Sequence, residues 1–382
     1  MSTTMLAGFF SVFGFGLIVA FLGSIKLQLA PRLGADNAQF GRIVAALQWV
    51  MVVMAIIGGL VIDVLGHQVA IGMGAVLAAA AVFLMGRVRA VGGVIALCVL
   101  LGIGAQFLNL GGNTLLPGLF ADPAAGSNLG NAFFGMGALL VSIIIVALFK
   151  RMAFDRALGL VALILLFPLF FALGGGFPTV APSFNPGVVL SLLGNYVTWI
   201  AALLLFCYIG LEVSLAAWIT SYAAELGADD AQAARTLSIF LVAMMVSRLL
   251  FGLQDKVTGI DLTSLGSSVL IGAALVAVVA LSVLIRTGSL RTARGWIFLI
   301  GFVFGPIFPT TIGVTFQHFA PSTWGTLFGV IFAVGLIGAA VLPVWIGKLA
   351  TGRTVQAGLG VLRGAAVGLS LVALALSLLP LA

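Results

Sequence analysis

The sequence contains very little charge. Only 7% of its 382 residues are Asp, Glu, Lys or Arg, whereas a soluble domain carries about 25%. Hydrophobic residues make up 62% of the chain. Because so few charged groups are available to face water, most of the chain must face lipid or its own interior. The composition therefore predicts an integral membrane protein whose main surroundings are the lipid bilayer.

Residues that bind metals or form disulfides are also scarce. Cys98 and Cys207 lie in apolar segments, and His67 and His318 are far apart in the sequence, so no metal-binding spacing exists. We expect no metal and no cofactor. No nucleophile–base pair appears, which argues against an enzyme. The formal net charge is +7, but the basic residues occur singly in short connections, so we expect no nucleic acid partner.

Long apolar runs are abundant. A membrane-spanning helix needs about 20 mostly apolar residues. Twelve runs satisfy this, at approximately 6–30, 40–62, 68–87, 91–119, 127–149, 156–174, 191–224, 233–254, 264–286, 293–316, 323–348 and 354–380. One connection, 175–190, is rich in Gly and Pro and is typical of a linker. The pattern predicts an all-α membrane protein, with a six-helix bundle at 1–174, this linker, and a second six-helix bundle at 191–382.

The two predicted bundles repeat each other. The segment GGLVIDVLG at 58–66 matches FGLQDKVTG at 251–259, and Asp63 and Asp255 are 192 positions apart. Phe134-Gly135 and Phe328-Gly329 are 194 positions apart. A nearly constant offset of half the chain predicts pseudo-symmetric halves. Repeats of this kind hold a substrate site near the middle of the bilayer.

The chain resembles a known family at these positions. Gly59, Asp63 and Gly66 in GLVIDVLG are similar to the G-x-x-x-D-x-x-G signature of the major facilitator superfamily. YIGLEVSLAAWITSYAAE, SRLLFG, GPIFPTTIG and LIGAAVLPVWIG resemble the fucose permease-like sugar:proton symporters. The resemblance implies the major facilitator fold, which has twelve transmembrane helices and works by alternating access. We expect a multi-pass protein of the cell (inner) membrane that is a monomer.

One carboxylate interrupts an apolar run. Glu212 lies near the middle of LLLFCYIGLEVSLAAWITSYAAE. A charge at that depth is costly and usually faces a cavity or a partner. We predict that Glu212 binds substrate or couples transport to a proton or sodium ion, and that Tyr208, one turn earlier on the same face, shares the site. The alternative is a neutral Glu that only bonds a neighbouring helix.

A polar stripe is the second candidate site. Gln106, Asn109 and Asn113 follow i, i+3, i+7 spacing on an apolar helix. Amides donate and accept hydrogen bonds, which suits a neutral polyhydroxylated ligand. Amides also join packed helices to each other, so that alternative stays open.

Three further substrate-binding candidates carry weaker signals. Gln48 lies in the second apolar run, and Asn195 and Trp199 are one turn apart in the seventh. An indole beside an amide can hold a sugar, although Trp199 can equally pack against lipid. Pro306 and Pro309 interrupt the tenth run and free backbone carbonyls, which is tolerated where those carbonyls find partners.

Asp63, Arg248 and Asp255 lie near the ends of apolar runs, and we interpret them as gating residues. In relatives, the acid of the signature loop holds neighbouring helices together in one state of the cycle. The basic pair that usually follows its glycine is His67-Gln68 here. The fucose-type symporters also carry acids on the first and fourth helices, which this chain lacks. Glu212 is therefore the coupling candidate.

We expect a secondary transporter of a small neutral polar solute, a sugar, with proton coupling as an option. The alternatives are an exporter of amphipathic or drug-like compounds and a non-transporting membrane receptor or sensor. The family resemblance places both termini in the cytoplasm, and we expect that orientation. The basic residues favour the opposite orientation. Nearly all of them lie in the connections that follow odd-numbered spans, and the positive-inside rule would place those connections in the cytoplasm.

Overall fold

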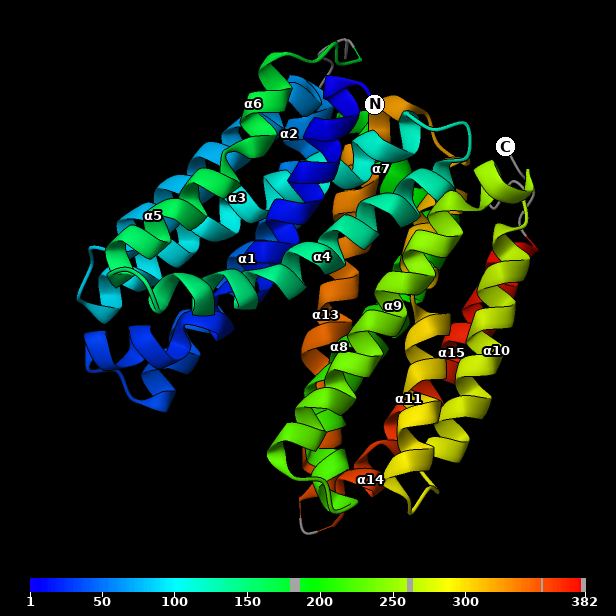
Figure 1. Cartoon of the computed structure of the whole chain (residues 1–382). Coiled ribbons are helices and arrows are strands. Elements are labelled where there is room, and N and C mark those ends of the chain that lie inside the picture. The colour runs from blue at the N-terminus through cyan, green and yellow to red at the C-terminus, as the bar shows by residue number, and fades with distance from the viewer. Residues whose placement is uncertain (179–185, 260–263, 352, 379–382) are drawn as a thin grey trace. The chain divides into compact units, whose positions relative to one another are not determined.

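Helices form almost all of the structure, a computed structural model that describes residues 1–178, 186–259, 264–351 and 353–378 (Figure 1). Among these residues there is no strand. The helices are α1 (Thr3–Leu33), α2 (Asn37–Met85), α3 (Val91–Gly118), α4 (Pro123–Phe149), α5 (Phe154–Leu165), α6 (Phe167–Leu173), α7 (Pro186–Gly194), α8 (Tyr196–Glu225), α9 (Asp230–Thr258), α10 (Gly266–Leu284), α11 (Leu290–Phe304), α12 (Ile307–Phe316), α13 (Trp324–Ala350), α14 (Val355–Gly358) and α15 (Gly360–Ser377), with one 3-10 turn at Pro321–Thr323.

Eleven helical stretches in the described part of the chain are long and apolar enough to cross a membrane. One of them, α2, contains two spans, because its 49 residues are interrupted at Gly66, which has φ 81° and ψ 166°. Glycine is the residue that adopts such a positive φ without a steric cost. The structure therefore confirms the predicted all-α membrane fold with its twelve spans.

The chain divides into two compact units. Unit 1 comprises Met1–Leu119, Phe133–Pro186 and Ser322–Gly329, and unit 2 comprises Phe120–Ala132, Gly187–Pro321 and Val330–Ala382. Both α4 and α13 are thus divided between the units. The first turns of α4 belong to unit 2 and its remainder to unit 1, whereas the first turns of α13 belong to unit 1 and its remainder to unit 2. The boundaries predicted at 174 and 191 stay a prediction, and the predicted linker includes residues 179–185, which lie outside the described part.

In unit 1, α2 and α3 pack most extensively, and α1, α5 and α6 cover them. Glycines allow this close approach. A Cβ added to Gly104 of α3 would lie 2.8 Å from the carbonyl oxygen of Gly74 on α2, and one added to Gly74 would lie 3.0 Å from the carbonyl oxygen of Gly104. Small residues at such crossings let backbones pack tightly in a membrane, where the hydrophobic effect does not drive association.

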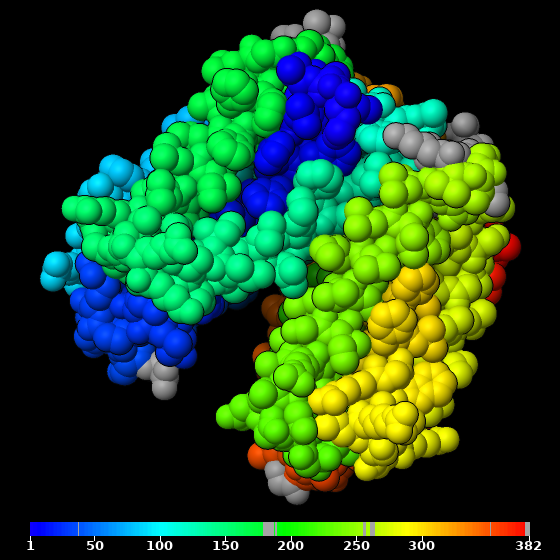
Figure 2. Space-filling view, viewed as in Figure 1, coloured from blue at the N-terminus to red at the C-terminus, as the bar shows by residue number. Residues whose placement is uncertain are grey.

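In unit 2, α8 to α12 and α15 form the packed body. α10 and α11 lie side by side at its surface, coloured yellow in the space-filling view (Figure 2). α9 and α11 approach closely through Gly301, where an added Cβ would lie 2.6 Å from the carbonyl oxygen of Phe240. This contact brings the middle of α9 next to the break between α11 and α12, where the main polar cluster of the unit lies.

Candidate functional site

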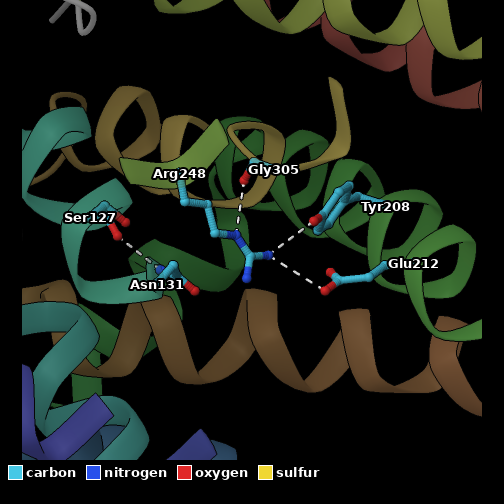
Figure 3. A network of polar contacts seen from close by, with 6 residues as sticks. All are labelled: Ser127, Asn131, Tyr208, Glu212, Arg248 and Gly305. Atoms are coloured by element: carbon cyan, nitrogen blue, oxygen red, sulfur yellow. Dashed lines mark hydrogen bonds and ion pairs between the residues drawn. The ribbon is translucent and has the colours of Figure 1, made fainter. Parts of the chain in front are cut away.

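A buried polar cluster lies in unit 2, where α8, α9 and the end of α11 meet (Figure 3). Its centre is Arg248 of α9. Nε of Arg248 donates to the carbonyl oxygen of Gly305 at 3.1 Å, and Nη2 donates to the hydroxyl of Tyr208 at 3.3 Å. The same Nη2 lies 3.5 Å from Oε1 of Glu212 and forms an ion pair with it. Two residues of α8 and the C-cap of α11 therefore hold the guanidinium of α9.

The prolines of GPIFPTTIG explain why a backbone carbonyl is available to Arg248. In a continuous helix, the carbonyl of Gly305 would accept from the N–H four residues later, at Pro309. Proline has no N–H, so this carbonyl has no helical donor. Arg248 supplies one, because its Nε donates to Gly305. The predicted freeing of carbonyls by these prolines thus has a structural consequence inside the cluster.

Burial differs sharply across the cluster. Arg248 is 3% exposed and Tyr208 0%, whereas the Glu212 side chain is 22% exposed. The ring of Tyr208 packs edge-on against Phe304, with 5.9 Å between the centroids. Within unit 2, Glu212 is thus the accessible member of a site whose other members are enclosed.

The ion pair carries no net charge, and its two charged groups are far apart for a direct pair. Charge-assisted N–H···O bonds are usually about 2.7–2.9 Å long, so the 3.5 Å separation of Arg248 and Glu212 is long for a direct pair. A guanidinium has five N–H donors, and the bonds with described residues use Nε and Nη2. The arrangement can therefore present a donor and an acceptor to one ligand.

The start of α4 adds polar groups to unit 2 that the sequence analysis missed. Figure 3 draws Ser127 and Asn131, where Nδ2 of Asn131 donates to the carbonyl oxygen of Ser127 at 3.0 Å. Oγ of Ser127 and Oδ1 of Asn128 are buried without a hydrogen-bond partner among the described residues. This segment packs on α9, since a Cβ added to Gly252 would lie 2.9 Å from the amide nitrogen of Leu129. The polar run in GSNLGN is the signal that could have identified it.

The position of Arg248 corrects one sequence-based expectation. We expected it near a helix end. Instead it lies well inside α9, which continues to Thr258, and its side chain is buried next to Glu212. The error arose because α9 extends beyond the predicted run of 233–254. Arg248 therefore lies beside Glu212 and Tyr208, and its gating role stays a prediction.

The polar stripe of α3 forms a hydrogen-bonded ladder in unit 1. Gln106 donates to the carbonyl oxygen of Met51 on α2 at 2.8 Å, and Asn109 donates to Oε1 of Gln106 at 3.0 Å. Asn113 donates to Oδ1 of Asn109 at 2.9 Å. All three amides are buried. Gln106 thus joins α3 to α2, and contact of Asn109 and Asn113 with a solute stays a proposal.

Asp63, in the signature loop, binds the start of α13 within unit 1. Its carboxylate accepts from the backbone N–H groups of Gly325 and Thr326, at 2.9 and 2.7 Å, and from the Thr326 hydroxyl. Gly59 lies one turn earlier, and a Cβ there would meet the carbonyl oxygen of Gly325 at 2.2 Å. Free N–H groups and the helix dipole make a helix N-terminus favourable for a carboxylate. This contact supports the gating proposal for Asp63.

Within the described part of the chain, the remaining candidates make no recorded contact with the members of the cluster. Gln48 is exposed on α2. Asn195 accepts from the N–H of Val197 as the cap of α8, and Trp199, 49% exposed, donates to the carbonyl oxygen of Leu193. These two precede Glu212 on α8 by 13 or more residues, which is roughly 20 Å along a helix. Asp255 lies in α9, but its side chain is outside the described part.

Comparisons with known proteins agree on one family. The sequence matches the Major Facilitator Superfamily over residues 4–343. A structure of the transporter FucP in the outward conformation is similar, with a TM-score of 0.79, 17% identity, and coverage of 98% of this chain and 99% of that one. A variant of the E. coli fucose:proton symporter FucP has a TM-score of 0.77, 16% identity, and coverage of 99% and 98%.

A third similar structure is the human organic anion transporter MFSD10, with a TM-score of 0.74, 16% identity, and coverage of 97% of this chain and 98% of that one. The comparison with curated proteins finds no similar sequence. At these identities, the structural matches establish the fold.

Proposed function

The chain belongs to the major facilitator superfamily of membrane transporters, and we propose that it moves a small neutral polar solute, a sugar, by alternating access across the cell (inner) membrane. The observation that carries this proposal is the Arg248–Glu212 pair in unit 2. It combines hydrogen-bond donors and an acceptor in one place without a net charge.

The chemistry of the pair favours a hydroxylated solute. A sugar hydroxyl can accept from the guanidinium of Arg248 while a neighbouring hydroxyl donates to the carboxylate of Glu212. The charges of the pair cancel, so a neutral solute leaves the local charge balance unchanged. A charged solute would leave one of the two groups without its counter-charge, which is costly in a buried site.

We further propose that Glu212 couples transport to protons. Its side chain is 22% exposed, whereas Arg248 is enclosed. Because a carboxylate facing lipid at this depth is costly, we infer that the exposed side of Glu212 faces water. Protonation would remove the negative charge and weaken the ion pair, while Arg248 keeps its bonds to Gly305 and Tyr208. The pair would re-form when the proton leaves. The similar fold of the E. coli fucose:proton symporter supports both the sugar and the proton in this proposal.

A second candidate is an exporter of amphipathic compounds. A row of aromatic rings extends from Tyr208, with Tyr208 and Phe308 centroids 6.4 Å apart and Phe308 and Phe332 centroids 6.1 Å apart. Such rings would suit an apolar body joined to a polar group. The human organic anion transporter with a similar fold is consistent with this candidate.

Counterflow in proteoliposomes distinguishes the two candidates. Vesicles are loaded with one unlabelled compound and tested for uptake of the same labelled compound. The panel contains neutral hexoses, deoxyhexoses and pentoses, their acid derivatives, and aromatic amphipathic compounds. The sugar proposal predicts counterflow with at least one neutral sugar and not with its acid derivative. Counterflow with amphipathic compounds alone would reject the sugar and support the exporter.

A further inference from the structure

Helix α4 carries a groove of about 560 Å³ along its exposed face, near its C-terminal end. The part of α4 from Phe133 onward belongs to unit 1, so the groove lies within that unit. Val141 and Ile145, on the other face of the helix, are buried. The residues that line the groove are Ser142, Ile143, Val146, Ala147, Lys150 and Arg151.

The groove follows one face of α4 and is apolar in its middle. The lining positions repeat at i, i+1, i+4, i+5, i+8 and i+9, which is the spacing of a single helix face. Ile143 and Val146 are 59% and 54% exposed. At the inner end, the hydroxyl of Ser142 shares a 2.8 Å hydrogen bond with Ser24 of α1. The apolar part therefore begins where α4 meets α1.

The length of the groove matches one leaflet of a bilayer. From Ser142 to Arg151 the chain advances nine residues, about 13.5 Å at 1.5 Å per residue. Half of a hydrocarbon core is about 15 Å thick. An acyl chain lying along this face would thus extend from near the middle of the bilayer to its polar boundary, where α4 ends at Phe149.

Two cations close the groove at that boundary. The N–H of Lys150 donates to the carbonyl oxygen of Val146 at 3.4 Å, and that of Arg151 donates to the carbonyl oxygen of Leu148 at 2.9 Å. These bonds continue the last turn of α4. Both side chains are exposed, and neither forms a hydrogen bond or an ion pair with the residues that the structure describes. Their charges are therefore available to a headgroup.

A third cation lies close to this end of α4. The guanidinium carbon of Arg32 on α1 lies 4.6 Å from the ring centroid of Phe154, and Phe154 stacks on Phe149 with 5.4 Å between the centroids. Phe149 directly precedes Lys150. A ring face attracts a guanidinium without neutralising its charge. The aromatic stack thus connects the end of α1 to the cations that follow α4.

Acidic groups at this end of unit 1 are fewer than basic ones. The connections α1–α2, α2–α3 and α4–α5 lie on one side of the membrane, because successive spans alternate in direction. Asp36 accepts from the N–H of Gln39 as the cap of α2, and Asp155 lies in the first turn of α5. Neither acid forms an ion pair with a described residue. The basic residues at these connections and in the adjoining turns are Arg32, Arg42, Arg87, Arg89, Lys150, Arg151 and Arg156.

We propose that the α4 groove binds one anionic phospholipid, with an acyl chain along Ile143 and Val146 and the phosphate at Lys150 and Arg151. A phosphate accepts charge-assisted hydrogen bonds from an ammonium and a guanidinium. Basic groups at the ends of membrane helices recognise anionic headgroups in this way. A choline lipid gains less, because its own cation neutralises its phosphate. The site depends neither on the transported solute nor on which leaflet this end faces.

Native mass spectrometry of the full chain in detergent tests the proposal. The protein is titrated with phosphatidylglycerol and with phosphatidylcholine of identical acyl chains. We expect phosphatidylglycerol to bind about ten-fold tighter, and Lys150→Gln/Arg151→Gln to remove that preference. The matched control is Arg42→Gln/Arg89→Gln, which removes the same charge from exposed positions of unit 1 that do not line the groove. The control should bind like the unmodified protein.

Ala147→Trp tests the groove separately from the charges. Ala147 is exposed, so the indole would fill the groove without disturbing the packed face, and we expect it to weaken phosphatidylglycerol binding while Lys150 and Arg151 remain. Unchanged binding by Ala147→Trp would overturn the role of the groove. Equal affinity for the two lipids, or equal losses from the Lys150/Arg151 variant and its control, would overturn the site, since the attraction would then be absent or unspecific.

Discussion

Oε1 of Glu212 lies 3.5 Å from Nη2 of Arg248, although the two residues are 36 positions apart and belong to different helices. The relationship joins the acid in the otherwise apolar middle of α8 to the enclosed cation of α9. Each group explains the presence of the other, since an unpaired charge in a membrane interior is costly. The partial exposure of Glu212 then leaves one side of the pair open to a ligand.

Arg248→Leu should destabilise the protein by about 1–3 kcal/mol, because it strands both Glu212 and the carbonyl of Gly305. Adding Glu212→Gln should restore part of the loss, since the stranded charge is then removed. Thermal unfolding in detergent measures both. Arg235→Leu, at an exposed position of the same helix, is the control and should unfold like the unmodified protein. Equal loss from Arg248→Leu with and without Glu212→Gln would show that the pair is not coupled.

Gly59→Ala should disrupt the contact between α2 and the start of α13. The added Cβ would lie 2.2 Å from the carbonyl oxygen of Gly325, and backbone cannot move aside as a flexible side chain can. Overpacking of this kind costs about 1–3 kcal/mol. Gly41→Ala on the same helix is the control, because nothing lies within 4 Å of its Cβ. Thermal unfolding should separate the two, and identical melting curves would contradict the close approach.

Asp63→Asn should slow transport without changing the affinity for the solute. The variant keeps the shape of the side chain but loses the charge at the helix N-terminus, an effect of about 0.3–1 kcal/mol. Thr326→Val removes the hydroxyl donor alone and should have the smaller effect. Counterflow rates and equilibrium binding measure the two quantities. A change in binding with an unchanged rate would place Asp63 at the solute site and reject the gating role.

Gln106→Leu and Asn113→Leu should have different consequences. Gln106 donates to the backbone of Met51 and accepts from Nδ2 of Asn109, so its loss leaves the buried Asn109 amide without this acceptor and should cost about 1–3 kcal/mol of stability. Asn113 lies at the other end of the ladder and is proposed to contact the solute. Its replacement should weaken binding with less loss of folded protein. Normal binding by folded Asn113→Leu would show that the whole stripe serves helix packing.

The sequence predicts the spans well because length and apolarity are local properties. The turn at Gly66 is also visible, since the GLVIDVLG signature requires a glycine there. The boundaries are less exact. The first run was predicted at 6–30, whereas α1 extends over Thr3–Leu33, because capping by Ser2 and Gly34 adds residues that hydropathy does not register.

The partners of Glu212 could not be predicted from one sequence. Tyr208 follows from helical spacing within α8, but Arg248 comes from α9, and its contact depends on how the two helices are rotated about their axes. The ladder of Gln106, Asn109 and Asn113 shows the same limit. Spacing identifies one polar face, and only packing shows that Gln106 bonds the backbone of α2.

The most direct test of the account uses Glu212→Gln in proteoliposomes, with a sugar that the unmodified protein exchanges. The variant keeps the size and most of the hydrogen bonding of Glu212 but cannot take up or release a proton. We predict that it retains counterflow and loses accumulation driven by a pH gradient. Accumulation equal to that of the unmodified protein would contradict proton coupling by Glu212, and if Glu212→Ala also transported normally, the Arg248–Glu212 pair would not be the solute site.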